Sequence, residues 1–320
     1  MKRILWILAA LVAAVSCTSS APSLSRAGRI AAEIHNPNSR YVVVACHRGD
    51  WRNWPENSIP AIESVIRMGA DIVEIDVKMT ADSVLVLSHD GDVKRCTNFS
   101  RLYKGVEGKS SKIRDLTLAE IKCLSLKRAH GVAVDTLRMP TLREALECTK
   151  DRICVNVDQG YEFYDQVLAI TEELGVTDQV LIKGSKSLKK VEEKLAQHEH
   201  NMMYMPIVNA EPGSKGLDLL NSYMEQGVVP LAYEVCWSTN EGKCFPAAAK
   251  RILEQGSKVW VNTIWASLCG GDGNDDDAAF QAADPGDVYQ QYLDQGVSMI
   301  QTDRPELLIG WLKKQGRHTL

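Results

Sequence analysis

Two carboxylates placed two residues apart are the first sign of chemistry in this chain. Glu74 and Asp76 close a run that begins with the apolar residues Ile72 and Val73, which is typical of a buried strand. Alternate side chains of a strand point to the same face, so both carboxylates face the same way. Such charges repel each other unless one is protonated or a cation lies between them. Hard oxygen ligands predict Mg²⁺ or Ca²⁺; two solvated charges on an exposed strand are the alternative.

Two of the seven histidines follow strand-like runs, in the sequences His47-Arg48-Gly49 and His89-Asp90. Histidine exchanges protons near neutral pH. On opposite sides of a metal-held phosphate, one histidine can activate the attacking oxygen and the other can protonate the leaving alkoxide. Arg48 offers a planar, permanently charged fork for phosphate oxygens, with a surface ion pair as the alternative. These residue types therefore predict phosphodiester cleavage.

The elements that must position these side chains alternate in type along the chain. Eight β-rich runs are predicted to be strands: residues 41–46, 71–77, 152–157, 179–183, 201–208, 228–235, 258–262 and 297–301. Helical patterns lie between them, and five glycines follow a helix and precede a strand, as C-caps do: Gly69, Gly175, Gly227, Gly256 and Gly296. This order predicts parallel βαβ units and, with eight strands, a TIM (β/α)₈ barrel. A doubly wound open sheet is the alternative.

One further strand-like run, residues 83–88, follows the second strand too closely for a parallel crossover. We therefore expect an extra antiparallel β-hairpin after the second strand. A tight turn near residues 81–82 would set Glu74 opposite His89. In a barrel, groups that do chemistry come from the carboxyl ends of several strands, where the predicted site residues fall.

Six short motifs occur in order along residues 41–312 and together resemble the glycerophosphodiester phosphodiesterase family. They are His-Arg-Gly at 47–49, Pro-Glu-Asn-Ser at 55–58, Glu-Ile-Asp-Val at 74–77, His-Asp at 89–90, Met-Pro-Thr-Leu-Arg-Glu-Ala-Leu at 139–146 and Thr-Asp-Arg-Pro-Glu at 302–306. No single motif is decisive, but six in register are highly specific.

The resemblance implies a TIM barrel that hydrolyses glycerophosphodiesters to sn-glycerol 3-phosphate and an alcohol. A substrate hydroxyl would attack phosphorus first, giving a cyclic phosphate that water then opens. Carried over, His47 and His89 become the general acid/base pair, Glu74 and Asp76 bind the metal, and Arg48 contacts the phosphate.

One departure from the family pattern concerns the third barrel strand, where the family usually carries Glu-x-Lys. This chain has Asn156-Val157-Asp158 instead, so the usual ligand and cation are missing. We expect Asp158 to complete the metal site and Lys183, at the end of the next strand, to contact the phosphate. Asn156 and Glu234 are further candidate ligands. The change leaves substrate identity more open than reaction class.

The N-terminus resembles an export signal. Lys2 and Arg3 precede a short apolar stretch, and Cys17 follows it. We expect a signal peptide over residues 1–16, a tether over 17–39 anchored to a membrane through lipidated Cys17, and the barrel domain over 40–320. The protein would then be exported, as a periplasmic or outer-membrane lipoprotein. An ordinary cleaved signal is the alternative.

Charge excludes one class of partner. The formal net charge is −4, and removal of residues 1–16 makes it −6, which argues against nucleic-acid binding. The expected partner is a small-molecule phosphodiester. Three other readings remain open: a phospholipase or cyclising lyase on lysolipid or inositol phospholipid head groups, a glycosidase, and a catalytically impaired binding lipoprotein. The oligomeric state is not predicted.

Overall fold

A computed structural model of the chain describes residues 24–129, 131–237, 244–265 and 274–320. The predicted signal peptide and Cys17 lie outside the described residues. Within this part of the chain, no helix is long and apolar enough to cross a membrane.

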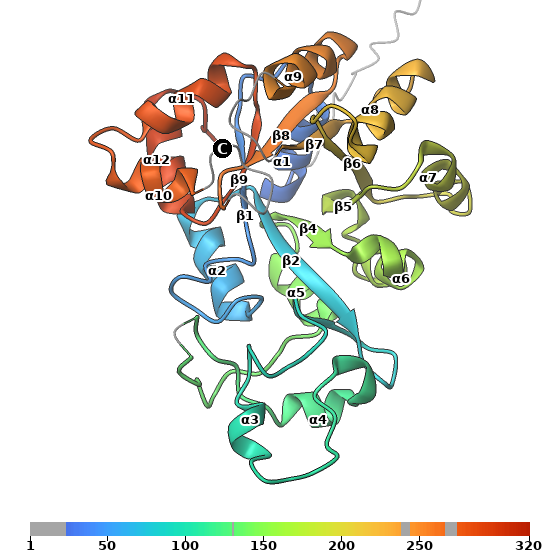
Figure 1. Cartoon of the computed structure of the whole chain (residues 1–320), viewed down its shortest axis with the longest axis vertical. Helices are drawn as coiled ribbons and strands as arrows, with labels where there is room; N and C mark the ends of the chain where they lie inside the picture. The colour runs from blue at the N-terminus through green and yellow to red at the C-terminus, as the bar shows by residue number, and fades with distance from the viewer. Residues whose placement is uncertain (1–23, 130, 238–243, 266–273) are drawn as a thin grey trace, which may run out of the picture.

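Eight parallel strands form a closed barrel (Figure 1). They are β1 (Val43–Cys46), β2 (Ile72–Met79), β4 (Cys154–Asp158), β5 (Val180–Gly184), β6 (Met203–Asn209), β7 (Ala232–Cys236), β8 (Lys258–Asn262) and β9 (Met299–Thr302). Strand β1 pairs with both β2 and β9, which closes the cylinder and excludes the open sheet. The predicted TIM barrel is confirmed, and each of the eight predicted runs contains one of these strands or overlaps it.

The helices that follow the strands surround the barrel (Figure 1). They are α2 (Ile59–Met68), α5 (Leu142–Thr149), α6 (Tyr164–Leu174), α7 (Leu188–Leu195), α8 (Lys215–Glu225), α9 (Cys244–Gln255), α10 (Asp275–Gln281), α11 (Gly286–Asp294) and α12 (Pro305–Lys314). The 3₁₀ turns η2 (Gly160–Phe163) and η3 (Thr177–Gln179) precede α6 and β5. All five predicted C-cap glycines have positive φ, a conformation that glycine adopts without strain.

The predicted hairpin is present, because β3 (Leu85–Leu87) pairs antiparallel with β2. Its register pairs Val77 with Leu87, so position 74 falls opposite position 90 and not opposite His89. The expected register was therefore wrong by one residue, because the turn spans Thr80 to Val84, with the Val84 N–H donating to Thr80 Oγ1 at 3.0 Å.

The described residues between β3 and α5 form a small subdomain, which lies away from the ring of helices, at the bottom of Figure 1. It contains α3 (Phe99–Leu102), η1 (Ile113–Asp115) and α4 (Leu118–Lys122). These elements enclose an apolar core of their own: Val86, Val93, Phe99, Ile113, Leu116, Ile121, Leu124, Leu126 and Met139.

Helix α1 (Arg26–His35) precedes β1 in the chain and packs against the barrel. Ser25 caps it, and its apolar side chains Ala27, Ile30 and Ile34 are fully buried against the layer that fills the barrel interior. Burying each isoleucine contributes about 1.5–3 kcal/mol. Residues 26–35 of the predicted tether therefore form a helix that packs against the barrel.

Candidate active site

The barrel interior changes from apolar to polar along its axis. Its lower layer is apolar: Val43, Ala45, Ile72, Cys154, Leu181, Met203, Met205, Ala232, Trp260 and Met299 belong to one buried cluster. Alternate positions nearer the carboxyl ends are polar and buried: His47, Glu74, Asp76, Asn156, Lys183, Glu234, Asn262, Gln301 and Asp303. This end is where barrel enzymes carry out their chemistry.

The turn after β1 presents a backbone donor to the carboxylates. Arg48 and Gly49 have φ values of +52° and +72°, so the chain reverses sharply. The Arg48 N–H then donates to Glu74 Oε2 at 2.7 Å. A Cβ at position 49 would lie 3.0 Å from the carbonyl carbon and Cβ of Ala61, which leaves glycine as the residue that fits.

His47 is held by a carboxylate that directly follows the last barrel strand. Its Nδ1 lies 2.9 Å from Asp303 Oδ1, and the Trp51 indole donates to the same oxygen at 2.6 Å. Because the aspartate accepts from Nδ1, Nε2 is the ring nitrogen left to exchange a proton. The ring is buried and meets Trp265 edge-on at 5.1 Å.

Asp303 is itself positioned by Asp276 at the start of α10. Asp276 accepts from the Asp303 N–H at 2.6 Å and from the hydroxyls of Thr263, Thr302 and Tyr289 at 2.8 Å. Burial raises the pKa of Asp276 to about 6. Asp276 thus fixes Asp303, and Asp303 in turn holds His47. The His47 ring is therefore positioned by two segments that are far from it in sequence.

Three carboxylates meet beside this turn. One ligand oxygen from each of Glu74, Asp76 and Asp158 lies within 4.8 Å of the others. Burial, together with Asp76 and Asp158, raises the pKa of Glu74 well above its ordinary value. Bringing buried carboxylates this close is costly unless a proton or a cation is shared.

The residues around the three carboxylates fit a hard divalent cation. Asn57 fixes Asp76 through two hydrogen bonds, donating to Oδ2 at 2.9 Å and accepting from the Asp76 N–H at 3.0 Å. Asn156 pairs with Glu74 in the β2–β4 register, and its Oδ1 is buried without a hydrogen-bond partner. An all-oxygen donor set with an additional unpartnered amide oxygen suits Mg²⁺ or Ca²⁺.

His89 follows β3, beside the middle of β2, the strand that carries Asp76. The Ser88 N–H donates to the Asp76 carbonyl at 3.1 Å, which ties the two segments together. His89 Nδ1 lies 2.8 Å from Asp90 Oδ1, and its side chain is 41% exposed, so it is open to solvent. Arg95 donates to Asp90 at 2.6 Å and lowers the pKa of that carboxyl to about 2.

Lys183 lies inside the barrel and is engaged by an acid. Its Nζ is 2.7 Å from Glu234 Oε2 and donates to Gln301 Oε1 at 3.3 Å. Although burial opposes the charge, Glu234, Asp158 and Glu74 raise the pKa of Lys183 above its ordinary value. The expected phosphate contact of Lys183 stays a prediction, and Glu234 is outside the three-carboxylate group.

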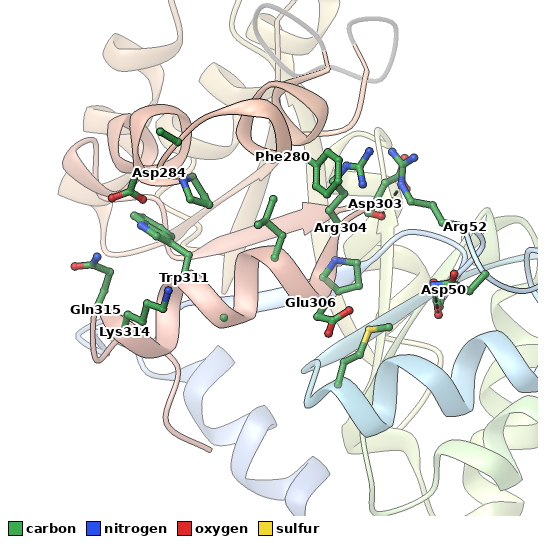
Figure 2. Close-up of a pocket in the computed structure, with 17 residues that line it drawn as sticks. Asp50, Arg52, Phe280, Asp284, Asp303, Arg304, Glu306, Trp311, Lys314 and Gln315 are labelled. Carbon is green, nitrogen blue, oxygen red and sulfur yellow. Dashed lines mark hydrogen bonds between the residues drawn. The ribbon is translucent and has the colours of Figure 1, made fainter.

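Two hollows adjoin this region. A pocket of about 260 Å³ is lined by His47, Arg48, Trp51 and Trp265, together with residues of the subdomain. A larger groove of about 660 Å³ lies outside the barrel, between α12 and the segment that contains Phe280 and Asp284 (Figure 2). Asp303 and Asp50 line that groove as well. None of the three clustered carboxylates lines it, and neither does His47 or His89.

The sequence motifs contained residues whose roles only the structure reveals. Asp303, Asp90, Glu56 and Asn57 all lie in the quoted motifs, yet none had been assigned a role from sequence. Their signal was their place in a motif: Asp90 directly follows His89, Glu56 and Asn57 precede α2, and Asp303 directly follows the last barrel strand. Glu56 binds Arg95 at 2.6 and 2.8 Å and Arg48 at 3.3 Å.

The fold and site define a (β/α)₈-barrel protein with a buried acidic centre and two histidines that each pair with an aspartate. The model of the glycerophosphoryl diester phosphodiesterase family matches residues 47–211, which is more than half of the chain. The chain belongs to this family. A second model, described only as a domain of unknown function, matches residues 204–312.

Individual relatives agree with this assignment. A glycerophosphodiester phosphodiesterase of Caldanaerobacter subterraneus is 32% identical over 165 residues, covering 49% of this chain and 63% of the relative. Glycerophosphodiester phosphodiesterase 1 of Bos taurus is 33% identical over 133 residues, covering 41% and 37%. The matches thus span less than two thirds of these relatives.

Solved structures share the fold over most of the chain. A glycerophosphoryl diester phosphodiesterase from Parabacteroides distasonis superposes with a TM-score of 0.68 at 19% identity, over 92% of this chain and 93% of the other. A phosphodiesterase from Oleispira antarctica, solved in complex with the product sn-glycerol-3-phosphate, gives 0.59 at 19% identity, over 85% and 96%.

Proposed function

We propose that this protein hydrolyses glycerophosphodiesters to sn-glycerol 3-phosphate and an alcohol, using His47 and His89 as general acid and base. The observation that carries the proposal is the pairing of buried His47 with Asp303 at 2.9 Å, next to the three-carboxylate group. Membership of the family and the product named for the Oleispira antarctica structure support the substrate class.

The roles follow from the contacts. Asp303 and Asp90 each hold one histidine through Nδ1, which leaves Nε2 to take a proton from the attacking hydroxyl or to give one to the leaving alkoxide. Arg48 Nη1 donates to Glu56 at 3.3 Å and Nε lies 3.5 Å from Asp76 Oδ2, so the guanidinium is held beside the carboxylates, where its remaining N–H groups can donate to a phosphate oxygen.

Glu74, Asp76 and Asp158 would hold a divalent cation, Mg²⁺ or Ca²⁺, with Asn156 Oδ1 as a further ligand. When bound, such an ion neutralises phosphate charge and stabilises the developing oxyanion. In this scheme Asp158 supplies the ligand that the family places at position 156.

The decisive test is turnover of defined diesters. Purified protein would be given glycerophosphocholine, glycerophosphoethanolamine and bis(p-nitrophenyl) phosphate, with EDTA, Mg²⁺ or Ca²⁺. We expect metal-dependent release of sn-glycerol 3-phosphate from the two glycerophosphodiesters, reduced about 10²–10⁴-fold in His47→Ala and in His89→Ala. Any turnover of bis(p-nitrophenyl) phosphate would be followed as release of p-nitrophenol. His200→Ala is the matched control, because His200 is exposed and pairs with Asp178 at 2.8 Å away from the site.

Three outcomes separate the candidate functions. Loss of turnover in both active-site variants but not in the control supports the proposal. Accumulation of a cyclic phosphate, seen by phosphorus NMR, would favour the cyclising lyase, for which the Asn156/Asp158 departure is the motivating observation. Binding without turnover of any diester under any metal would favour the binding protein and overturn the hydrolase.

We propose further that Cys17 is lipidated and anchors the protein to a membrane after export. The arrangement of residues 1–17 supports this. Metabolic labelling with an alkyne fatty acid should label the intact protein and leave Cys17→Ser unlabelled and soluble. Equal labelling of both proteins would contradict it.

A further inference from the structure

The pocket of about 260 Å³ beside His47 is strongly basic. Four of its lining residues carry a positive charge and one carries a negative charge: Arg48, Arg95, Lys127 and Arg128 against Glu56. The segment after β1 contributes His47, Arg48 and Glu56, and the subdomain contributes Lys127 and Arg128. A small molecule that reaches His47 through this pocket therefore meets residues of both segments.

Two of the four positive charges are already balanced. Arg95 binds Glu56 at 2.6 and 2.8 Å and Asp90 at 2.6 Å. Arg48 lies 3.3 Å from Glu56 and 3.5 Å from Asp76. These two guanidinium groups therefore belong to the network that holds His89 and the carboxylates.

The other two charges have no acidic partner in the part of the chain that the structure describes. Lys127 Nζ donates to the carbonyl oxygen of Lys94 at 2.9 Å, and the Arg128 guanidinium lies over the Trp54 ring at 5.6 Å. Among the described residues, no carboxylate lies within 4.0 Å of either cation. The described lining residues thus give the pocket about two units of unbalanced positive charge next to His47.

The aromatic side chains nearby do not make the pocket favourable for a cationic group. A cationic head group such as choline binds over the open faces of aromatic rings. Trp54 already carries Arg128 on one face, and Trp51 carries Arg52 at 4.9 Å. Like charge from these guanidinium groups disfavours a second cation, whereas an anion gains charge-assisted hydrogen bonds.

We propose that this pocket receives the alcohol portion of the diester and selects an alcohol that carries an additional anionic group, a phosphomonoester or a carboxylate. This inference rests on the proposed function. Lys127 supplies a mobile ammonium and Arg128 a planar fork, a combination suited to phosphate or carboxylate oxygens. The substrate class is therefore the anionic glycerophosphodiesters.

Two matched substrate pairs test the inference and distinguish its two chemistries. Glycerophosphoinositol 4-phosphate differs from glycerophosphoinositol by one phosphomonoester, and glycerophosphoserine differs from glycerophosphoethanolamine by one carboxylate. We expect kcat/KM to be about tenfold higher for the more anionic member of at least one pair, because its KM is lower. The pair that shows the effect identifies the group.

The variants link the preference to the pocket. In the double variant Lys127→Ala/Arg128→Ala, the ratio of kcat/KM between the two members of that pair should fall to about one. Lys104→Ala is the control, because it removes one exposed charge of the same subdomain outside the pocket and should keep the wild-type ratio. A ratio near one in the wild-type protein for both pairs, or a ratio that the double variant leaves intact, overturns the inference.

Calorimetric binding separates this failure from failure of the proposed function. The four compounds would be titrated into His89→Ala, in which turnover is expected to be about 10²–10⁴-fold slower. Turnover of the diesters without preference refutes only the pocket assignment. Tighter binding of the anionic member, lost in a variant that combines His89→Ala with Lys127→Ala and Arg128→Ala, supports the pocket even if the wild-type protein hydrolyses none of them.

Discussion

Asp303 accepts hydrogen bonds from His47 and Trp51 through the same carboxylate oxygen, whereas Asp90 holds His89 through Oδ1 and accepts from Arg95 through Oδ2. These two acids stand apart from the group of Glu74, Asp76 and Asp158, whose oxygens face one another. At the residue scale the site therefore uses carboxylates for two purposes, which are to fix imidazole rings and to gather negative charge.

Replacing Asp303 tests the first purpose. Asp303→Asn keeps the size of the side chain but removes the charge that fixes the His47 tautomer and stabilises its protonated form. We expect kcat to fall about 10²–10⁴-fold with a smaller change in KM. Steady-state kinetics on any turned-over diester measures this. Asp178→Asn is the matched control, since Asp178 pairs with exposed His200; equal kcat in the two variants would contradict the role.

Metal removal tests the second purpose through pH. The folded pKa of Glu74 is raised above the value of 4.5 that it has when unfolded. The metal-free folded protein thus retains a proton that the unfolded chain releases, and its free energy of unfolding should fall as pH rises from 4.5 through the folded pKa. Mg²⁺ or Ca²⁺ should displace that proton and remove the slope.

Urea unfolding between pH 5 and 8, with EDTA or with metal, measures the two slopes. Calorimetry in buffers of different ionisation enthalpy counts the protons that metal releases. Glu74→Gln cannot lose the proton, so its metal-free slope should already be flatter. Identical slopes with and without metal in the wild-type protein would show that no cation binds between these carboxylates.

The sequence identified the candidate metal ligands more readily than the residues that position the histidines. Glu74 and Asp76 were chosen as ligands from their type and alternate spacing, and Asp158 from the departure from the Glu-x-Lys pattern that the family resemblance implies; the structure brings the three together. Asp303 lies 256 residues from His47, and no local pattern connects them. Only closure of the barrel by the β1–β9 pairing makes them neighbours.

Elements were predicted where local signals agreed with tertiary structure. Apolar runs and C-cap glycines marked all eight barrel strands, because a buried parallel strand is apolar on both faces. The subdomain after β3 was not predicted. Its helices α3 and α4 have four and five residues and are too short to form without the core that they enclose. Hairpin register depended on turn geometry, which spacing alone did not fix.

The turn after β1 can be tested as an element. Gly49→Ala should lower the free energy of unfolding by about 1–3 kcal/mol, because alanine is strained at φ +72° and its Cβ would lie 3.0 Å from Ala61. Turnover should fall as well, since the Arg48 N–H would move away from Glu74. Gly310→Ala, in exposed helix with open space around it, should instead stabilise by about 0.5–1 kcal/mol. Urea unfolding compares them, and equal effects would contradict the strain.

At the scale of the whole molecule, the two ends of the barrel separate stability from chemistry. The carboxyl end gathers buried charges that oppose folding unless they are paired or bound. The opposite end is closed by an apolar interior layer and by α1. Barrel proteins commonly divide their residues in this way, with activity at one face and stability at the other.

A substitution in α1 should therefore change stability without changing catalysis. Ile30 is fully buried against the interior layer, so Ile30→Ala should lower the free energy of unfolding by about 2–5 kcal/mol. Because α1 lies at the end away from the carboxylates, kcat and KM of the folded fraction should match those of the wild-type protein. Leu24→Ala removes a side chain that is 60% exposed and should change stability by less than about 0.5 kcal/mol. A fall in kcat for Ile30→Ala below its unfolding temperature would show that the two ends of the barrel are coupled.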